Sequence, residues 1–380
     1  MRRNKNGFLA ALLVAALLLC GQPAFAEGET DGDIVYTMVD EHGRAIAKRA
    51  GRMYVGDGLI VADNTEYAVT AVDDTHRIAY AERVENALET IAVPVTGTKL
   101  EQAGEKAVDK MQQAVDTDER LVCLYCTHSD ESYEPTDGEY SLEKDAGIYD
   151  VSEAFAESLQ SLGVQVERSE DTFLPHDSGA YRRSRSTAAE FAKMTPAAIF
   201  DIHRDGIPDP TEYEETVGGE EIAQVRLLVG RSNENADINK SFAKQIKAAA
   251  DEKYPGLIRD IYIGKGNYNQ ELYPRALLLE FGTYSNDKEL VLKSTDMMAD
   301  AVTVALFGAG QSVQQREETK AEENTAAAKG VAWVVGIALL GGLVYALVST
   351  GTLKNLGAKI SSGTGELTGG LFGGKKRDKH

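Results

Sequence analysis

Two histidines and one glutamate each follow a short apolar run in this 380-residue sequence, and these runs are typical of buried strands: His128, His203 and Glu280. One such residue alone is ordinary, because a histidine or glutamate often stands where a strand meets water. Three of them are compatible with a catalytic zinc site, which takes three protein ligands and leaves a position open for water. Such a site also uses a carboxylate that accepts the proton of that water. Two histidines supply only two ligands, so a further carboxylate is needed.

Strand and helix patterns alternate along residues 120–308, and this alternation predicts an α/β fold with a mostly parallel sheet flanked by helices. Sites in such folds lie beyond the carboxyl ends of the strands, which is where these three residues fall. Strands are expected at LVCLY, VQVER, AAIFDI, AQVRLLVG and RALLLE, and helices over Ile148–Leu162, RSRSTAAEFAKM, Asp237–Lys253 and about Asp287–Leu306.

Residues outside 120–308 have a different sequence pattern. Residues 27–84 contain short extended segments between Gly, Asn and Asp residues, which predicts a small β-rich accessory module of three to five strands. Residues 85–119 form a polar connector between this module and the catalytic domain at 120–308. Residues 309–330 form a polar linker without aliphatic periodicity.

Both ends of the chain carry apolar segments. Residues 1–26 have basic residues, an apolar run and a small-residue cleavage site, so they indicate a signal peptide. Whether Cys20 is lipidated is left open. Residues 331–348 contain no charge and predict a single C-terminal transmembrane helix, and the basic tail 349–380 is then cytoplasmic. The expected location is the cell membrane, with the catalytic domain extracytoplasmic.

The net charge constrains the ligand. The formal charge is −20 although the C-terminal tail is basic, so the exported part is strongly acidic. This argues against nucleic acid as its ligand, because nucleic-acid binding draws on Lys and Arg that neutralise phosphates.

Four separated motifs resemble the stage II sporulation protein P family, whose members are related to zinc N-acetylmuramoyl-L-alanine amidases. The motifs cover roughly residues 120–306 and include YCTHSDESY, HDSGAYRRSRST, DIHRDG and YPGLIRDIYIGKGNYNQELYPRALLLEFG. The family usually has HTH where this chain has Cys126-Thr127-His128. It also usually has an N-terminal membrane helix, whereas a signal peptide and a C-terminal helix are expected here.

The resemblance implies a set of metal ligands. In the amidase fold, a metal-binding glutamate heads a Glu-Lys-Asp sequence some fifteen residues after the first metal histidine, and Glu143-Lys144-Asp145 stands at that position here. The implied zinc ligands are therefore His128, Glu143 and His203, with Asp145 as the alternative to Glu143. Glu280 maps to the catalytic glutamate.

Four further residues are candidates for substrate contact. His176 lies in a loop and would order that segment or touch substrate. Arg182 and Arg185 could pair with carboxylates of a stem peptide, or they could form the solvated start of a helix. Asn269 suits amide recognition and loop ordering equally.

The resemblance implies a zinc-dependent peptidoglycan hydrolase that cleaves the N-acetylmuramoyl-L-alanine amide bond in septal cell-wall remodelling during sporulation engulfment. It also implies endopeptidase cleavage of peptide cross-links, a lytic transglycosylase partner similar to stage II sporulation protein D, and a membrane scaffold. The alternative is a catalytically inactive peptidoglycan-binding module, or a membrane scaffold that recruits a partner hydrolase.

Overall fold

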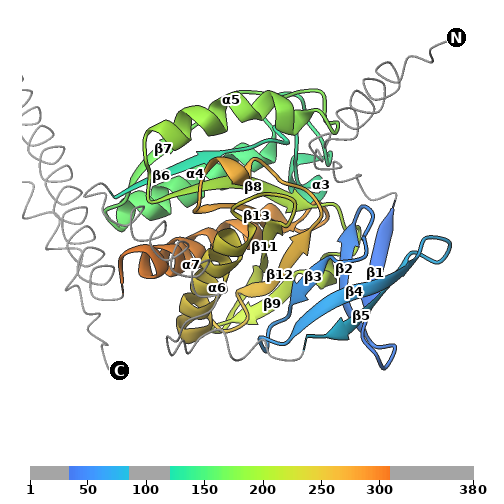
Figure 1. Cartoon of the computed structure of the whole chain (residues 1–380). Coiled ribbons are helices and arrows are strands. Elements are labelled where there is room, and N and C mark those ends of the chain that lie inside the picture. Colours follow the sequence, from blue (N-terminus) through green and yellow to red (C-terminus); the bar gives the residue numbers. More distant parts are fainter. Residues whose placement is uncertain (1–33, 85–119, 309–380) are drawn as a thin grey trace, which may run out of the picture. The chain divides into compact units, whose positions relative to one another are not determined.

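One large β-sheet forms the centre of the described part of the chain. The computed structural model describes residues 34–84 and 120–308 (Figure 1). Eleven strands form a sheet in the order β2-β1-β5-β4-β3-β12-β11-β13-β8-β6-β7, and β9 pairs with β10 separately. The strands are β1 (Val35–Val39), β2 (Ala45–Ala50), β3 (Gly58–Ile60), β4 (Glu66–Asp73), β5 (Ile78–Arg83), β6 (Leu121–Tyr125), β7 (Gln165–Arg168), β8 (Ala198–Asp205), β9 (Glu214–Val217), β10 (Glu220–Ala223), β11 (Val225–Gly230), β12 (Ile258–Gly264) and β13 (Ala276–Thr283).

The helices agree with those expected from apolar spacing. On α4 the buried positions include Ile148, Val151, Phe155 and Leu159, which recur every three or four residues and so form one face. The helices are α3 (Glu134–Asp137), α4 (Gly147–Ser161), α5 (Ala180–Lys193), α6 (Ala236–Lys253) and α7 (Lys288–Phe307), with short 3-10 helices η2 (Pro210–Glu212) and η3 (Gln270–Leu272).

The strand directions agree only in part with the mostly parallel sheet expected from the sequence. Strands β7, β6, β8 and β13 run parallel to one another, as expected for an α/β fold. Strand β11 runs antiparallel to β13, and β12 runs parallel to β11. The sheet is therefore mixed, with its direction reversing between β13 and β11.

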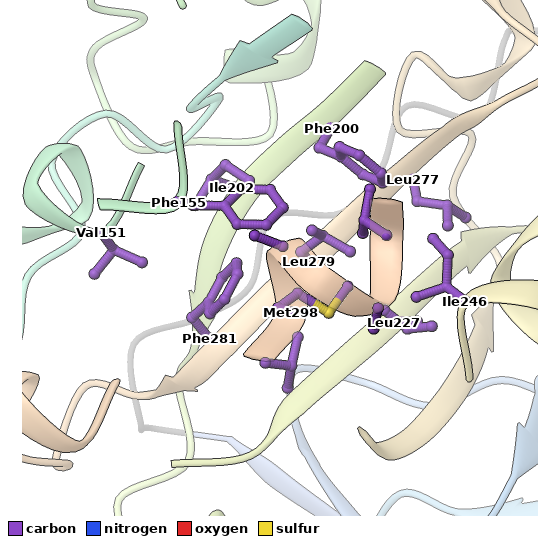
Figure 2. Close-up of a cluster of buried hydrophobic side chains, with 14 of the residues drawn as sticks. Val151, Phe155, Phe200, Ile202, Leu227, Ile246, Leu277, Leu279, Phe281 and Met298 are labelled. Carbon is purple, nitrogen blue, oxygen red and sulfur yellow. The ribbon is translucent and has the colours of Figure 1, made fainter. Parts of the chain in front are cut away.

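Successive side chains of the central strands point alternately to the two faces of the sheet. Figure 2 shows Phe155 of α4 and Met298 of α7 near Phe281 of β13, and these side chains belong to one buried apolar cluster. That cluster also takes the alternate residues Leu277 and Leu279 of β13. Because successive side chains of a strand point to opposite faces, the intervening position 280 faces the other side of the sheet.

The β-rich module belongs to the same sheet as the predicted catalytic domain. Strand β3 pairs antiparallel with β12, which joins residues 34–84 to the strands of 120–308. Five strands form this part, the upper end of the expected range. Its apolar side chains pack with Leu228, Tyr262 and Leu278 in a second buried cluster. Since Leu278 is two residues from Glu280, these N-terminal strands cover part of the face that carries Glu280.

The fold class expected from the sequence needs one correction. It included a C-terminal transmembrane helix, but within residues 34–84 and 120–308 no helix is both long enough and apolar enough to cross a membrane. The amphipathic helices of these ranges instead bury one face against the sheet. The expected span at 331–348 lies outside the described residues, as do the signal peptide, the connector, the linker and the basic tail.

Candidate metal centre

His128 and Glu131 form the first part of a buried cluster just beyond strand β6. The chain turns after β6, and the backbone amide of Glu131 donates to the carbonyl of His128 at 3.1 Å. This turn brings the two side chains together, with His128 Nδ1 3.1 Å from Glu131 Oε1. Both side chains are fully buried. The other carboxylate oxygen, Oε2, accepts a hydrogen bond from the backbone amide of Arg204 at 3.1 Å, so Glu131 is held on both sides.

His176 completes a group with metal-binding geometry. Its ring stacks on that of His128, with the centroids 4.0 Å apart. Its Nδ1 lies 3.0 Å from Asp130 Oδ1, which fixes the orientation of the ring. One potential ligand atom from each of His128, Glu131 and His176 lies within 4.8 Å of the others. Two imidazoles and a carboxylate form a donor set that suits a divalent transition metal such as zinc.

His203 lies beside this group on strand β8. Its Nδ1 is 3.4 Å from Glu131 Oε1, the same oxygen that faces His128. Its Nε2 is 3.0 Å from Asp201 Oδ1, and its ring centroid is 4.8 Å from that of His128. The structure therefore brings the two histidines expected from the sequence together.

The pKa values of the cluster follow from burial and close charges. Burial, followed by the neighbouring His176, lowers the pKa of His128 to about 4. Burial alone would raise the pKa of Glu131, but His203, Arg204 and hydrogen bonds to both imidazoles hold this pKa well below its ordinary value. At neutral pH His128 is thus a neutral imidazole and Glu131 an ionised carboxylate, which are the forms that bind metals.

His203 has the opposite electrostatic character. Burial opposes its positive charge, yet the charges of Asp201 and Glu131 and hydrogen bonds to both raise the pKa of His203 well above its ordinary value. In the metal-free protein His203 therefore carries a proton and balances the charge of the two carboxylates.

Glu280 lies on β13, the strand that pairs with β8. It occupies the position on β13 that pairs with His203 on β8, so both side chains point to the same face of the sheet. Glu280 is fully buried, and its Oε2 accepts a hydrogen bond from Tyr213 Oη at 3.1 Å. Glu280 is therefore a buried carboxylate on the strand next to His203.

Glu143 is not brought into the cluster. It is exposed, in the turn that precedes α4. The chain between Glu131 and Glu143 doubles back, with a bridge between Glu131 and Ser141 and a hydrogen bond from the Leu142 amide to the Asp130 carbonyl at 2.7 Å. The following residues lead outward, and the alternative Asp145 is also exposed.

The expected substrate-contacting residues separate into different environments. His176 belongs to the cluster, whereas Arg182 is exposed on α5. Arg185 is paired with Glu271. Asn269 is buried and its amide donates to the carbonyl of Tyr181 at 3.0 Å and to a neighbouring serine, so it orders the loop after β12.

Glu131 was missed from the sequence. It stands three residues after His128, and His-x-x-Glu across a tight turn can place both side chains on one side. That spacing was the available indication. Tyr213 and Arg226, which contact Glu280, come from segments without a recognisable motif.

Comparison with known proteins identifies the family. The model of the family described as stage II sporulation protein P (SpoIIP) matches residues 43–303. Stage II sporulation protein P of Bacillus subtilis (strain 168) is 29% identical over 222 residues, which are 53% of this chain and 55% of the relative. The chain thus spans about half the length of this curated relative.

Two solved amidase structures were also found. An N-acetylmuramoyl-L-alanine amidase from Clostridium difficile 630 is 14% identical, with a TM-score of 0.33, and the match covers 50% of this chain and 95% of that one. The CwlD amidase from Clostridioides difficile, in complex with the GerS lipoprotein, is 14% identical with a TM-score of 0.32, covering 49% and 95%. Scores this low carry no argument about activity. The family model matches residues 43–303, most of the chain, and this protein therefore belongs to the stage II sporulation protein P family.

Proposed function

We propose that this protein is a zinc-dependent peptidoglycan hydrolase that cleaves the amide bond between N-acetylmuramic acid and L-alanine during sporulation. The observation that carries the proposal is the group of buried His128 and Glu131 with partly buried His176, near His203, which pairs with Glu280. Membership of a sporulation family supports the biological setting. Cleavage of peptide cross-links and cooperation with a lytic transglycosylase similar to stage II sporulation protein D belong to the same proposal.

The residues present fit a zinc ion. His128 Nε2 is buried and has no hydrogen-bond partner among the described residues, which is a costly state for a polar atom unless a ligand completes it. The neutral His128 and ionised Glu131 would provide two ligands, and His176 would provide the third. Asp130 would orient His176 through its Nδ1, as carboxylates commonly do for metal-binding histidines.

Bound zinc would acidify a water molecule and polarise the scissile carbonyl. Glu280 would accept the proton of the attacking water and return it to the leaving amine of L-alanine. His203, which is protonated in the metal-free protein, lies between Glu131 and Asp201 and would keep these carboxylates from repelling one another. The burial of Glu280 and Glu131 would exclude competing water and strengthen these interactions.

Solvent reaches the group from one side. The side chains of His128 and Glu131 are fully buried, whereas 12% of the His176 side chain is exposed. We infer that substrate approaches from the His176 side, past the start of α5, where Tyr181 lies with its ring 5.5 Å from that of His128.

The test is the chemical identity of the released fragments. The full chain, with zinc added, should release stem peptides with a free L-alanine amino group from purified peptidoglycan and leave intact glycan strands. Mass spectrometry of both fractions identifies the cut bond. Glycan strands that keep their stem peptides but lose peptide cross-links would assign endopeptidase activity, and absence of any cleavage would favour a catalytically inactive binding module.

A further inference from the structure

A row of buried polar residues crosses four neighbouring strands and ends at the candidate metal centre. The strand registers place Asp260 of β12 opposite Arg226 of β11, Arg226 opposite Glu280 of β13, and Glu280 opposite His203 of β8. These side chains share the face that the N-terminal strands partly cover. Most apolar strands would place Val or Leu at such positions, so a row of charges there needs a reason.

Arg226 holds the middle of this row. Its guanidinium pairs with Asp260 through two bonds, Nε to Oδ1 at 2.7 Å and Nη2 to Oδ2 at 3.0 Å. Its Nη1 donates to Asp205 Oδ2 at 2.8 Å and lies 3.6 Å from Glu280 Oε2. Because the guanidinium is fully buried and fixed on two sides, it presents a positive charge to Glu280 in a set position.

Tyr213 lies between the carboxylates of Asp205 and Glu280. Its hydroxyl lies 2.8 Å from Asp205 Oδ2 and 3.1 Å from Glu280 Oε2. Burial is the main reason that the pKa of Tyr213 is well above its ordinary value, so the phenol keeps its proton. One hydroxyl proton is thus available between two carboxylate oxygens, and Tyr213 can hold Glu280 by one oxygen.

The N-terminal strands reach this network directly. Arg226 Nη2 donates to the backbone carbonyl of Lys48 on β2 at 2.9 Å. The ammonium of Lys48 lies 2.7 Å from Glu212 Oε1, one residue before Tyr213. Residues 34–84 therefore contact Arg226 directly, and through Lys48 they also hold the residue that precedes Tyr213.

We propose that Tyr213 and Arg226 are positioning residues that fix the carboxylate of Glu280 beside the metal centre. This inference rests on the proposed function, in which Glu280 is the general base. Tyr213 and Arg226 hold Glu280 at Oε2, and the N-terminal strands support them from the other side. A base held in one orientation reacts faster than a mobile one, because the entropy of orienting its side chain is already lost before the reaction begins.

The test compares two changes of the same kind. Tyr213→Phe removes only the hydroxyl, and Tyr36→Phe is the matched control, because Tyr36 donates to Asp74 at 2.7 Å outside this network. We expect Tyr213→Phe to lower kcat on peptidoglycan about tenfold or more, with KM and zinc stoichiometry unchanged, since a hydrogen bond to a charged group is lost. Tyr36→Phe should retain the wild-type kcat.

A second measurement does not depend on activity. A buried hydroxyl bonded to a carboxylate gives a slowly exchanging, downfield proton resonance in the metal-free full chain. The resonance that disappears in Tyr213→Phe should shift in Glu280→Gln, because its partner has lost its charge. An unchanged position in Glu280→Gln would show that Tyr213 donates to Asp205 alone, and the inference would be wrong.

The outcomes distinguish this inference from the proposed function. If Glu280→Gln loses activity while Tyr213→Phe retains the wild-type kcat, Glu280 is the base and the positioning role is wrong. If Glu280→Gln retains the wild-type rate, the proposed function fails and the inference fails with it.

Discussion

Glu280 and His203 stand opposite one another in two neighbouring parallel strands, β13 and β8, with their side chains on the same face of the sheet. This pairing places the proposed base next to His203, whose Nδ1 lies 3.4 Å from Glu131 Oε1. The relationship depends on strand register, and a one-residue slip of β13 would turn Glu280 into the apolar core shown in Figure 2.

Glu131 rather than Glu143 should be required for zinc. Glu131 is buried between two histidines, whereas Glu143 is exposed. We expect Glu131→Gln to lose bound zinc and Glu143→Gln to retain about one ion per chain, because only the first change weakens a metal ligand. Metal analysis of the purified proteins measures this. Zinc loss only in Glu143→Gln would restore the ligand set that the family resemblance implied.

The third zinc ligand can be assigned by a second pair of variants. The arrangement of side chains favours His176, which lies with His128 and Glu131 in one group. The sequence favours His203, whose Nδ1 is 3.4 Å from Glu131. We expect His176→Ala to weaken zinc binding more than His203→Ala does, as measured by competition with a chelator. The reverse order would return the third ligand to His203.

The metal-free protein should lose stability as the pH falls from about 6.5, the value of an unfolded-state histidine, towards 4. His128 has its pKa lowered to about 4, mainly by burial. Between these values the unfolded chain binds a proton that the folded chain does not, so acid favours unfolding. Between pH 6.5 and 4.5, His128→Asn should therefore lose about 2 kcal/mol less unfolding free energy than the wild type.

Urea unfolding in the presence of a chelator measures this difference. His203 acts in the opposite direction: burial lowers its pKa, but nearby carboxylates outweigh burial and raise it, and His203 is present in both proteins. Equal losses in the wild type and in His128→Asn would show that His128 is not held neutral.

The N-terminal strands should be needed for folding of the rest. Removing residues 1–84 would leave β12 without its partner β3 and would expose Leu228, Tyr262 and Leu278. An unpaired edge beside exposed apolar side chains promotes aggregation. We expect a chain beginning at residue 85 to elute as aggregates in size-exclusion chromatography. A soluble, cooperatively unfolding monomer would show that residues 34–84 are dispensable.

The sequence was sufficient for the parts of the fold that depend on local periodicity. The apolar spacing on α4 and the apolar runs before His203 and Glu280 predict a helix and two strands that the structure contains. The same runs predict that His203 and Glu280 follow their strands, whereas both lie within β8 and β13, at paired positions on one face of the sheet.

Features that depend on long-range pairing could not be read from the sequence. Nothing local indicates that β3 pairs with β12, or that β11 reverses direction beside β13. Glu131 sits in a turn, where neither helical nor strand periodicity applies. Glu143 was selected by its distance along the chain, but the bridge between Glu131 and Ser141 folds the chain back and directs Glu143 outward.

The most direct test of the account separates metal binding from proton transfer at Glu280. Glu280→Gln keeps the size of the side chain and leaves His128, Glu131 and His176 in place. General acid–base catalysis contributes about 10²–10⁴-fold in rate. We expect this variant to bind zinc and peptidoglycan like the wild type and to release dye from labelled peptidoglycan more slowly by about that factor. Cleavage by Glu280→Gln at the wild-type rate, with zinc bound, would contradict the account.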